Sequence, residues 1–367
     1  MRPCPVALVG CMLVTLLAAC GGDGSGSGSL SVSQAARELH ATNIQRYLYQ
    51  FEPVSEQVNG DWTEYLYDPA KEEAVCFSGN RYQVNVRFGT VNKVLLYLEG
   101  GGACWDEGTC YVASIAKQSA GGAPPIGILA KNVDNNPFKD WSVVYAPYCD
   151  GSVFGGDNEI LYGSRRTLHH GLQNVSAAIT QMRKYFPNPD QILVAGSSAG
   201  GYGTFTGYAV TRVAYPRTPI LILDDSGPGL QNPDDPVTAE ARLSAWRFNE
   251  LLPPSCDRCD EQITYLTEWA LDRDPALRVG YFDYLQDAVL QFFLGMNGPE
   301  FEELLRAVTD DLRTRQPDRF KRFMPAGSRH TILLSAGFYQ LAVDGITMRD
   351  WTAGLLEDGD SWQDVSD

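Results

Sequence analysis

The sequence predicts an α/β fold with a mostly parallel central sheet flanked by helices. Short, continuous apolar runs recur along the chain, at 94–98, 141–146, 192–195, 219–225 and 277–282. Segments with helical spacing of apolar residues lie between them, the clearest at 167–186. Strands that are apolar on both faces and separated by helices are typical of a parallel sheet covered on both sides. With 367 residues, of which 44% are hydrophobic, the chain is long enough for one large domain of this kind.

Other segments complete the predicted domain, which we place at 32–367. We expect a helix at 32–42 and short antiparallel strands at 63–67 and 82–87, where aromatic residues alternate with polar ones. The stretch 228–274 is rich in Pro and Asp and has helical segments. Because it lies between two predicted strands, we interpret it as a possible small cap.

The N-terminus has the features of an export signal. Arg2 is followed by an apolar run at 6–19 that ends in Leu-Ala-Ala-Cys20, which is similar to the bacterial lipobox. Residues 1–19 therefore fit a lipoprotein signal peptide, and 20–31 fit a lipidated Cys20 with a flexible Gly/Ser linker. We expect an exported protein of the bacterial cell envelope, held at the membrane by its N-terminal lipid.

Net charge and motifs exclude several classes of partner. The formal net charge is −16, which argues against nucleic-acid binding, because phosphate contacts require clustered Lys and Arg. The phosphate-binding patterns Gly-x-x-x-x-Gly-Lys-Ser/Thr and Gly-x-Gly-x-x-Gly do not occur after a first strand. We therefore expect no nucleotide, metal or other cofactor.

Cysteine usage is consistent with export. Three of the nine cysteines lie within residues 1–20, and six remain. An even number in an exported domain indicates disulfides, although sequence alone leaves the pairing open. Pairing of near neighbours would join Cys104 to Cys110 and Cys256 to Cys259, leaving Cys76 for Cys149. A Cys-x-x-Cys pair also fits a redox or zinc site, but no second such motif and no nearby histidine accompany 256–259, so we expect a structural bridge.

The segment 191–203 contains a candidate nucleophile. Its apolar run is followed by Gly196-Ser197-Ser198-Ala199-Gly200, which fits the Gly-x-Ser-x-Gly elbow of the α/β-hydrolase fold. There a serine occupies a strained turn between a strand and a helix, and the residues two before and two after it must be small. A flexible Gly/Ser loop would give the same letters, but the preceding apolar strand favours a catalytic Ser198.

The base and the acid follow from chain order, which in this fold is Ser, acid, His. The chain has four histidines, and His330 alone lies after Ser198; the others are His40, His169 and His170. Two aspartates between Ser198 and His330 lie at the ends of predicted strands: Asp225 is the last residue of the run 219–225, and Asp283 directly follows the run 277–282. We favour Asp283, one strand further on, while Asp225 also fits a turn aspartate.

An oxyanion hole requires two backbone N–H groups aimed at the developing charge. One should come from Ala199, directly after the nucleophile. The other should come from the glycine-rich loop 98–105, Leu-Glu-Gly-Gly-Gly-Ala-Cys-Trp, which follows an early strand. Three consecutive glycines are entropically costly, which favours a functional role for the loop.

Four fragments together resemble the pectin acetylesterase family, which includes Notum-like carboxylesterases. They are Leu98–Cys104, Tyr148–Ser152, Ala195–Gly201 and Asp225–Gly227, and the likeness is closest to the bacterial branch. Asp283-Tyr284-Leu285-Gln286 also matches the family's Asp-x-x-Gln segment. The resemblance implies the triad Ser198, Asp283 and His330, and oxyanion donors Gly101, Gly102 and Ala199. It also implies structural roles for Cys104, Cys110 and Cys149.

We therefore predict a serine carboxylic-ester hydrolase that acts through an acyl-enzyme. By the resemblance, the acyl group is small, such as acetate, and the ester belongs to a polysaccharide or a small molecule. A carbohydrate-binding surface lipoprotein with a degenerate esterase site is the alternative from another class, and it would lack a triad member. A lipase or peptidase with the same triad is a further alternative.

Overall fold

The computed structural model describes residues 31–367. The predicted signal peptide 1–19, the lipidation site Cys20 and all but the last residue of the predicted linker 20–31 lie outside these residues.

Within the described residues, ten strands form one sheet in the order β1-β2-β3-β5-β4-β8-β9-β10-β11-β14. The strands β5, β4, β8, β9, β10, β11 and β14 run parallel to one another. The first three strands are antiparallel, and β3 also joins β5 in antiparallel fashion. This confirms the predicted mostly parallel sheet. The bounds are β1 Ser55–Asn59, β2 Trp62–Leu66, β3 Gln83–Arg87, β4 Lys93–Leu98, β5 Ser142–Ala146, β8 Gln191–Ser197, β9 Ile220–Asp225, β10 Arg278–Phe282, β11 Phe320–Met324 and β14 Val365–Ser366.

Two small hairpins and a set of helices complete the described part of the chain. The hairpins are β6 (Asn158–Tyr162) with β7 (Arg165–His169), and β12 (Ala342–Val343) with β13 (Ile346–Thr347). The α-helices are α1 Gln34–Ala41, α2 Gly171–Tyr185, α3 Ala199–Tyr202, α4 Thr204–Ala214, α5 Pro236–Trp246, α6 Tyr265–Arg273, α7 Ala288–Leu294, α8 Gly298–Arg315, α9 Gly337–Gln340 and α10 Met348–Glu357. Short η segments are η1 Pro69–Lys71, η2 Gly108–Val112, η3 Gly127–Leu129 and η4 Phe248–Leu251.

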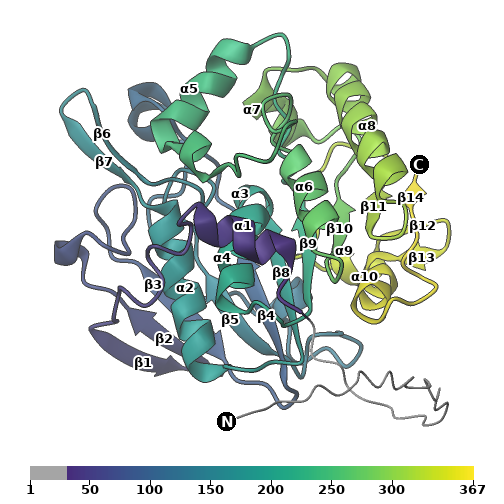
Figure 1. Cartoon of the computed structure of the whole chain (residues 1–367), viewed down its shortest axis with the longest axis horizontal. Helices are drawn as coiled ribbons and strands as arrows, with labels where there is room; N and C mark the ends of the chain where they lie inside the picture. The colour runs from purple at the N-terminus through teal and green to yellow at the C-terminus, as the bar shows by residue number, and fades with distance from the viewer. Residues whose placement is uncertain (1–30) are drawn as a thin grey trace, which may run out of the picture.

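The sheet separates two hydrophobic cores. Along β4, Leu96 and Leu98 point into the core shared with α2 and α4, while Leu95 and Tyr97 point into the core shared with α10. This alternation is the period-two geometry of a strand, and it explains why the strand is apolar throughout. Figure 1 shows α1, α2 and α4 lying across one face of the sheet.

The predicted helix at 167–186 is wrong in its first residues. Residues 165–169 form β7, which pairs with β6 from Asn158 opposite His169 to Tyr162 opposite Arg165, and α2 begins only at Gly171. Ladder hydrogen bonds of the hairpin therefore override the apolar periodicity at Leu168. His169, the last residue of β7, is buried, and its Nδ1 lies 3.0 Å from the carbonyl oxygen of Asp150.

The stretch 228–274 lies between β9 and β10 and contains α5, η4 and α6. In Figure 1, α5 and α7 lie together at the top of the molecule, above α3. No helix of the described residues has both the length and the apolar character needed to cross a bilayer.

The six cysteines within residues 31–367 form three disulfides, with the pairing that the sequence predicts. They join Cys76 to Cys149, Cys104 to Cys110, and Cys256 to Cys259. The last pair closes its Cys-x-x-Cys motif on itself. In the part of the chain that the structure describes, no cluster of three or more His, Cys, Asp or Glu side chains is arranged to hold a metal ion.

Candidate active site

Ser198 lies between the end of β8 and the start of α3 in a left-handed backbone conformation, with φ 57° and ψ −120°. A non-glycine residue rarely adopts positive φ, and such strain marks functional turns. The turn is held from both sides: the Ser198 N–H donates to the Asp225 carbonyl at 2.8 Å, and the Ser198 carbonyl accepts from the Tyr202 N–H at 3.0 Å. The half-buried Ser198 side chain therefore stands out of the sheet.

The two glycines that flank Ser198 are required by close backbone contacts. A Cβ atom at Gly196 would lie 2.1 Å from the carbonyl oxygen of Gly200. A Cβ atom at Gly200 would lie 2.0 Å from the carbonyl oxygen of Leu98, at the end of β4. Each distance is far inside van der Waals contact, so the Gly-x-Ser-x-Gly spacing reflects the packing of α3 against β8 and β4.

His330 lies on the loop between β11 and α9, with its side chain 16% exposed. Its Nδ1 atom is 2.6 Å from Oδ2 of Asp287. Because a carboxylate accepts hydrogen bonds, this contact assigns the ring proton to Nδ1 and leaves Nε2 with a free lone pair. Nε2 is buried and has no hydrogen-bond partner within residues 31–367, so it is available to accept a proton.

The expected contact between Asp283 and His330 is wrong: the structure pairs His330 with Asp287, four residues later. Asp283 directly follows β10, and its carboxyl accepts from Tyr281 Oη at 2.6 Å and Ser226 Oγ at 3.1 Å. Asp287 lies beyond the strand, where the chain enters α7, and so reaches the histidine loop. The sequence signal for Asp287 is its position directly before the apolar run of α7, which also indicates a helix cap.

Asp225, the alternative acid, does not contact the His330 ring but holds its loop. Its carboxylate accepts from the N–H of Ile332 at 2.9 Å and of Leu333 at 3.0 Å, and also from Ser197 Oγ. Burial raises the pKa of Asp225 to about 6. Since the Asp225 carbonyl also accepts from the Ser198 N–H, one residue connects the serine turn to the histidine loop.

The glycine-rich loop after β4 lies against the serine. A Cβ atom at Gly100 would lie 3.0 Å from Cβ of Ser198. Gly102 has φ +77°, and a Cβ there would lie 2.0 Å from the Ile115 carbonyl oxygen, so only glycine fits. The Gly101 carbonyl accepts from the Lys117 N–H at 2.8 Å, which orients the loop. Both Gly102 and Ala199 line the same pocket as Ser198, whereas Gly101 does not.

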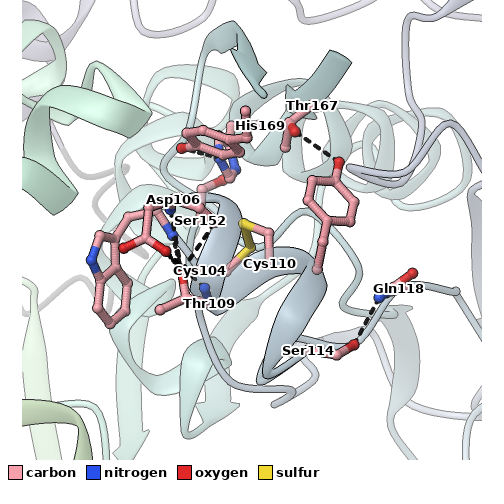
Figure 2. The surroundings of a disulfide bond; sticks show 12 residues. Cys104, Asp106, Thr109, Cys110, Ser114, Gln118, Ser152, Thr167 and His169 are labelled. Atoms are coloured by element: carbon pink, nitrogen blue, oxygen red, sulfur yellow. Dashed lines mark hydrogen bonds between the residues drawn. A yellow bond between two sulfur atoms is a disulfide. The ribbon is translucent and has the colours of Figure 1, made fainter. Parts of the chain in front are cut away.

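The Cys104–Cys110 bridge closes the segment that follows the glycines, as Figure 2 shows. Inside it, the Thr109 N–H donates to Oδ1 of Asp106 at 2.7 Å. The Cys104 N–H donates to the Gly151 carbonyl at 2.9 Å. His169 lies beside this bridge in Figure 2, and burial lowers the pKa of its ring to about 4. Both ring nitrogens of His169 have partners, the Asp150 carbonyl and the Tyr162 hydroxyl, so His169 has a structural role.

A largely apolar pocket opens beside Ser198, with a cavity volume of about 130 Å³. Helices α5 and α7 and the loop after the glycines contribute most of its large side chains, among them Trp105, Leu243, Trp246, Leu290 and Phe293. One cation borders it: the Arg242 guanidinium lies over the Trp105 ring, 4.3 Å from the ring centroid. The lining suits an apolar group attached to an ester.

Comparison with known proteins identifies a related family. The model of the pectinacetylesterase family matches residues 56–253. Pectin acetylesterase 7 of Arabidopsis thaliana is 28% identical over 177 residues, which are 44% of this chain and 44% of that protein. Palmitoleoyl-protein carboxylesterase notum1' of Xenopus laevis is 25% identical over 296 residues, 69% of this chain and 59% of that protein. The chain thus spans less than two thirds of the length of these relatives.

A solved structure supports the fold. The Wnt deacylase Notum from Drosophila superposes with a TM-score of 0.61 at 17% sequence identity, covering 78% of this chain and 91% of that one. The chain therefore has the fold of an α/β hydrolase, as its strand order and serine turn already indicate.

Proposed function

The chain belongs to the pectinacetylesterase family, and we propose that it is a serine carboxylesterase whose triad is Ser198, His330 and Asp287. The observation that carries the proposal is the strained turn at Ser198, which lies beside an apolar pocket and is connected through Asp225 to the loop that carries His330. On that loop, Nδ1 of His330 contacts the buried carboxylate of Asp287, and Nε2 has no hydrogen-bond partner among the described residues. The esterase activity is common to the relatives' names.

The proposed reaction begins with proton transfer. Nε2 of His330 takes the proton of Ser198 Oγ as the serine attacks the ester carbonyl, and the Asp287 carboxylate stabilises the imidazolium that forms. His330 then gives this proton to the alkoxide leaving group, and the alcohol departs. In the second half, His330 removes a proton from water, which attacks the acyl-enzyme; His330 then returns this proton to Ser198 Oγ as the acyl–oxygen bond breaks and the acid leaves.

The developing oxyanion would be bound by backbone N–H groups. Ala199 begins α3, where the first N–H groups have no acceptor within the helix. Gly102 contributes the second N–H from the opposite wall, with Gly101 beside it. Preorganised donors of this kind contribute about 10²–10³ in kcat each.

The pocket favours a longer acyl chain than the acetyl group that the family resemblance implies. An acetyl group has one methyl to bury. The side chains of Leu243, Leu290 and Phe293 present enough apolar surface to contact several methylene groups of a longer acyl chain. Each methylene transferred from water into such a site contributes about 0.8 kcal/mol. We therefore propose that the acyl chain lies between α5 and α7, and that the alcohol part of the ester faces solvent.

A chain-length series tests this assignment. We expect kcat/KM for p-nitrophenyl esters to rise from acetate through butyrate to octanoate. A preference for acetate would restrict the enzyme to small acyl groups, such as those of acetylated polysaccharides. No turnover of any of these esters by folded protein would contradict the esterase assignment and leave a carbohydrate-binding role.

From the sequence of residues 1–31 we also propose export and lipidation at Cys20. The test is the distribution of the protein between membrane and soluble fractions. Cys20→Ser should move it to the soluble fraction, and unchanged membrane association would contradict the proposal.

A further inference from the structure

Two carboxyl groups, not one, lie behind His330. Asp283 and Asp287 are both fully buried and lie four residues apart, and the negative charge of Asp287 acts on the Asp283 carboxyl. In residues 31–367, no Lys or Arg forms an ion pair with either of them, and the His330 ring is the one basic group in contact. Repulsion between two buried carboxylates raises the cost of ionising both, which favours one proton on the pair.

The two carboxyl groups differ in their hydrogen-bond partners. Oδ1 of Asp287 accepts from two backbone N–H groups, those of Val289 at 2.9 Å and Leu290 at 3.0 Å, and Oδ2 accepts from His330. Backbone N–H groups can only donate hydrogen bonds, so Oδ1 of Asp287 must accept from them and cannot itself carry the carboxyl proton.

Asp283 has partners of another kind. The Asp283 carboxyl accepts hydrogen bonds from the hydroxyl groups of Ser226 and Tyr281. A hydroxyl group can donate or accept a hydrogen bond, so these partners are compatible with a protonated, neutral Asp283. Burial, followed by the charge of Asp287, raises the pKa of Asp283 well above its ordinary value.

We propose that Asp283 is a neutral carboxylic acid that donates its proton in a hydrogen bond to Asp287, so that the pair carries one negative charge and presents it to His330. The inference rests on the proposed function, in which Asp287 is the triad carboxylate. Asp283 is then a positioning residue. It fixes Asp287 from behind, and through Ser226 Oγ, which also accepts from the Thr331 N–H at 3.3 Å, it reaches the loop beside His330.

Among residues 31–367, no Lys or Arg forms an ion pair with the Asp283 carboxyl. Besides Asp287 and Tyr281, Tyr202 on α3 is a titratable group on which the Asp283 charge acts, and Asp224 on β9 acts on the same two tyrosines. All of them are neutral or negative at their usual protonation states. Ionisation of Asp283 at alkaline pH would therefore push the two carboxylates apart and disturb the contact with His330.

The test compares removal of the Asp283 carboxyl with its neutral replacement. Asp283→Ala removes a hydrogen bond to a charged group, so we expect kcat for p-nitrophenyl butyrate to fall about 10- to 100-fold with little change in KM. Asp283→Asn keeps a neutral donor and should restore kcat to within about fivefold of the wild type. A loss in Asp283→Asn equal to that in Asp287→Asn would mean that Asp283 must be ionised, and would overturn the proposal.

The pH profile separates positioning from a purely structural role. The wild type should lose kcat on the alkaline side as Asp283 ionises, and Asp283→Asn, which has no proton to lose there, should not show this loss. Identical alkaline limbs in the two proteins would contradict the proposal. Asp283→Asn should also fold, because it mimics the neutral acid. Failure to fold, judged by thermal melting, would likewise count against a neutral Asp283.

Infrared spectroscopy at pH 7 reads the proton directly. The carbonyl band of a protonated carboxylic acid should weaken in Asp283→Asn relative to the wild type, and an unchanged band would overturn the proposal. The infrared outcome does not depend on the esterase assignment, which stands or falls with Ser198. Full activity of Asp287→Asn with an inactive Asp283→Asn would exchange the roles of the two aspartates and leave the serine esterase intact.

Discussion

The Nδ1 atom of His330 lies 2.6 Å from Oδ2 of Asp287, and the other carboxylate oxygen of Asp287 caps α7. One side chain therefore orients the candidate base and begins the helix that lines the pocket. Asp287→Asn keeps a cap acceptor but removes the charge and favours the wrong histidine tautomer. We predict that kcat falls about 10⁴-fold while the melting temperature changes little.

The control for this prediction is Asp287→Ala, which should lose the same activity and, in addition, about 1 kcal/mol of stability through the lost cap. Steady-state kinetics and urea unfolding of the two variants measure both effects. A kcat for Asp287→Asn within tenfold of the wild type would exclude Asp287 from the triad.

The raised pKa of Asp225 should make the free energy of unfolding depend on pH. Its pKa in the folded protein is raised by burial to about 6, above the ordinary value of 3.8. Between these values the folded protein binds more protons than the unfolded chain, so the contribution of Asp225 to the free energy of unfolding falls as pH rises from about 4 to 6 and then stays constant. Asp225→Asn removes this contribution.

The measurement is urea unfolding of the wild type and Asp225→Asn between pH 4 and 7. The stability of the wild type relative to the variant should decline up to about pH 6. The buried Asp150, whose pKa burial also raises to about 6, is present in both proteins and cancels. Parallel stability curves would contradict this account of Asp225.

A larger side chain on α5 should reduce the length of the pocket. Leu243 lines it and is half-buried, so Leu243→Trp should fill space that a long acyl chain would occupy. We predict that kcat/KM falls at least tenfold for p-nitrophenyl octanoate and less than threefold for acetate, since each excluded methylene costs about 0.8 kcal/mol. Val237→Trp is the matched control, because Val237 lies on the same helix and is 77% exposed. An equal loss on both esters would place the acyl chain elsewhere.

The disulfides should differ in their contribution to stability. The Cys76–Cys149 bridge spans 73 residues of sequence and the Cys104–Cys110 bridge spans 6. Loop-closure entropy predicts a loss of about 4 kcal/mol for the paired alanine variant of the first and about 2 kcal/mol for the second. Urea unfolding compares them. The second variant should in addition lose activity, because its loop continues from the oxyanion glycines, and full activity would separate that loop from catalysis.

The sequence predicts those features that depend on local patterns. Continuous apolar runs predict the central strands, and Gly196 and Gly200 predict the turn at Ser198, because each signal reflects contacts within a few residues. The acid is different. Asp283 directly follows its strand, which is the position that chain order favours for the acid. The loop that carries His330 instead extends to Asp287, and no local sequence pattern shows which of the two aspartates the histidine contacts.

Long-range pairing also explains the other differences. Residues 165–169 have helical periodicity but pair with β6, because the hydrogen bonds of the hairpin outweigh their weak local preference for a helix. The link through Asp225, whose carbonyl binds the serine turn and whose carboxylate binds the histidine loop, joins residues 107 positions apart. Such a contact depends on the order of strands in the sheet, which the sequence does not reveal.

The most direct test of the central claim is hydrolysis of p-nitrophenyl butyrate by the wild type and by Ser198→Ala, with thermal melting of both. If Ser198 is the nucleophile, kcat falls by at least about 10³-fold while the melting temperature stays within a few degrees, since the substitution removes one hydroxyl from a half-buried position. Retention of more than a tenth of the wild-type kcat by the folded variant would contradict a serine esterase centred on Ser198.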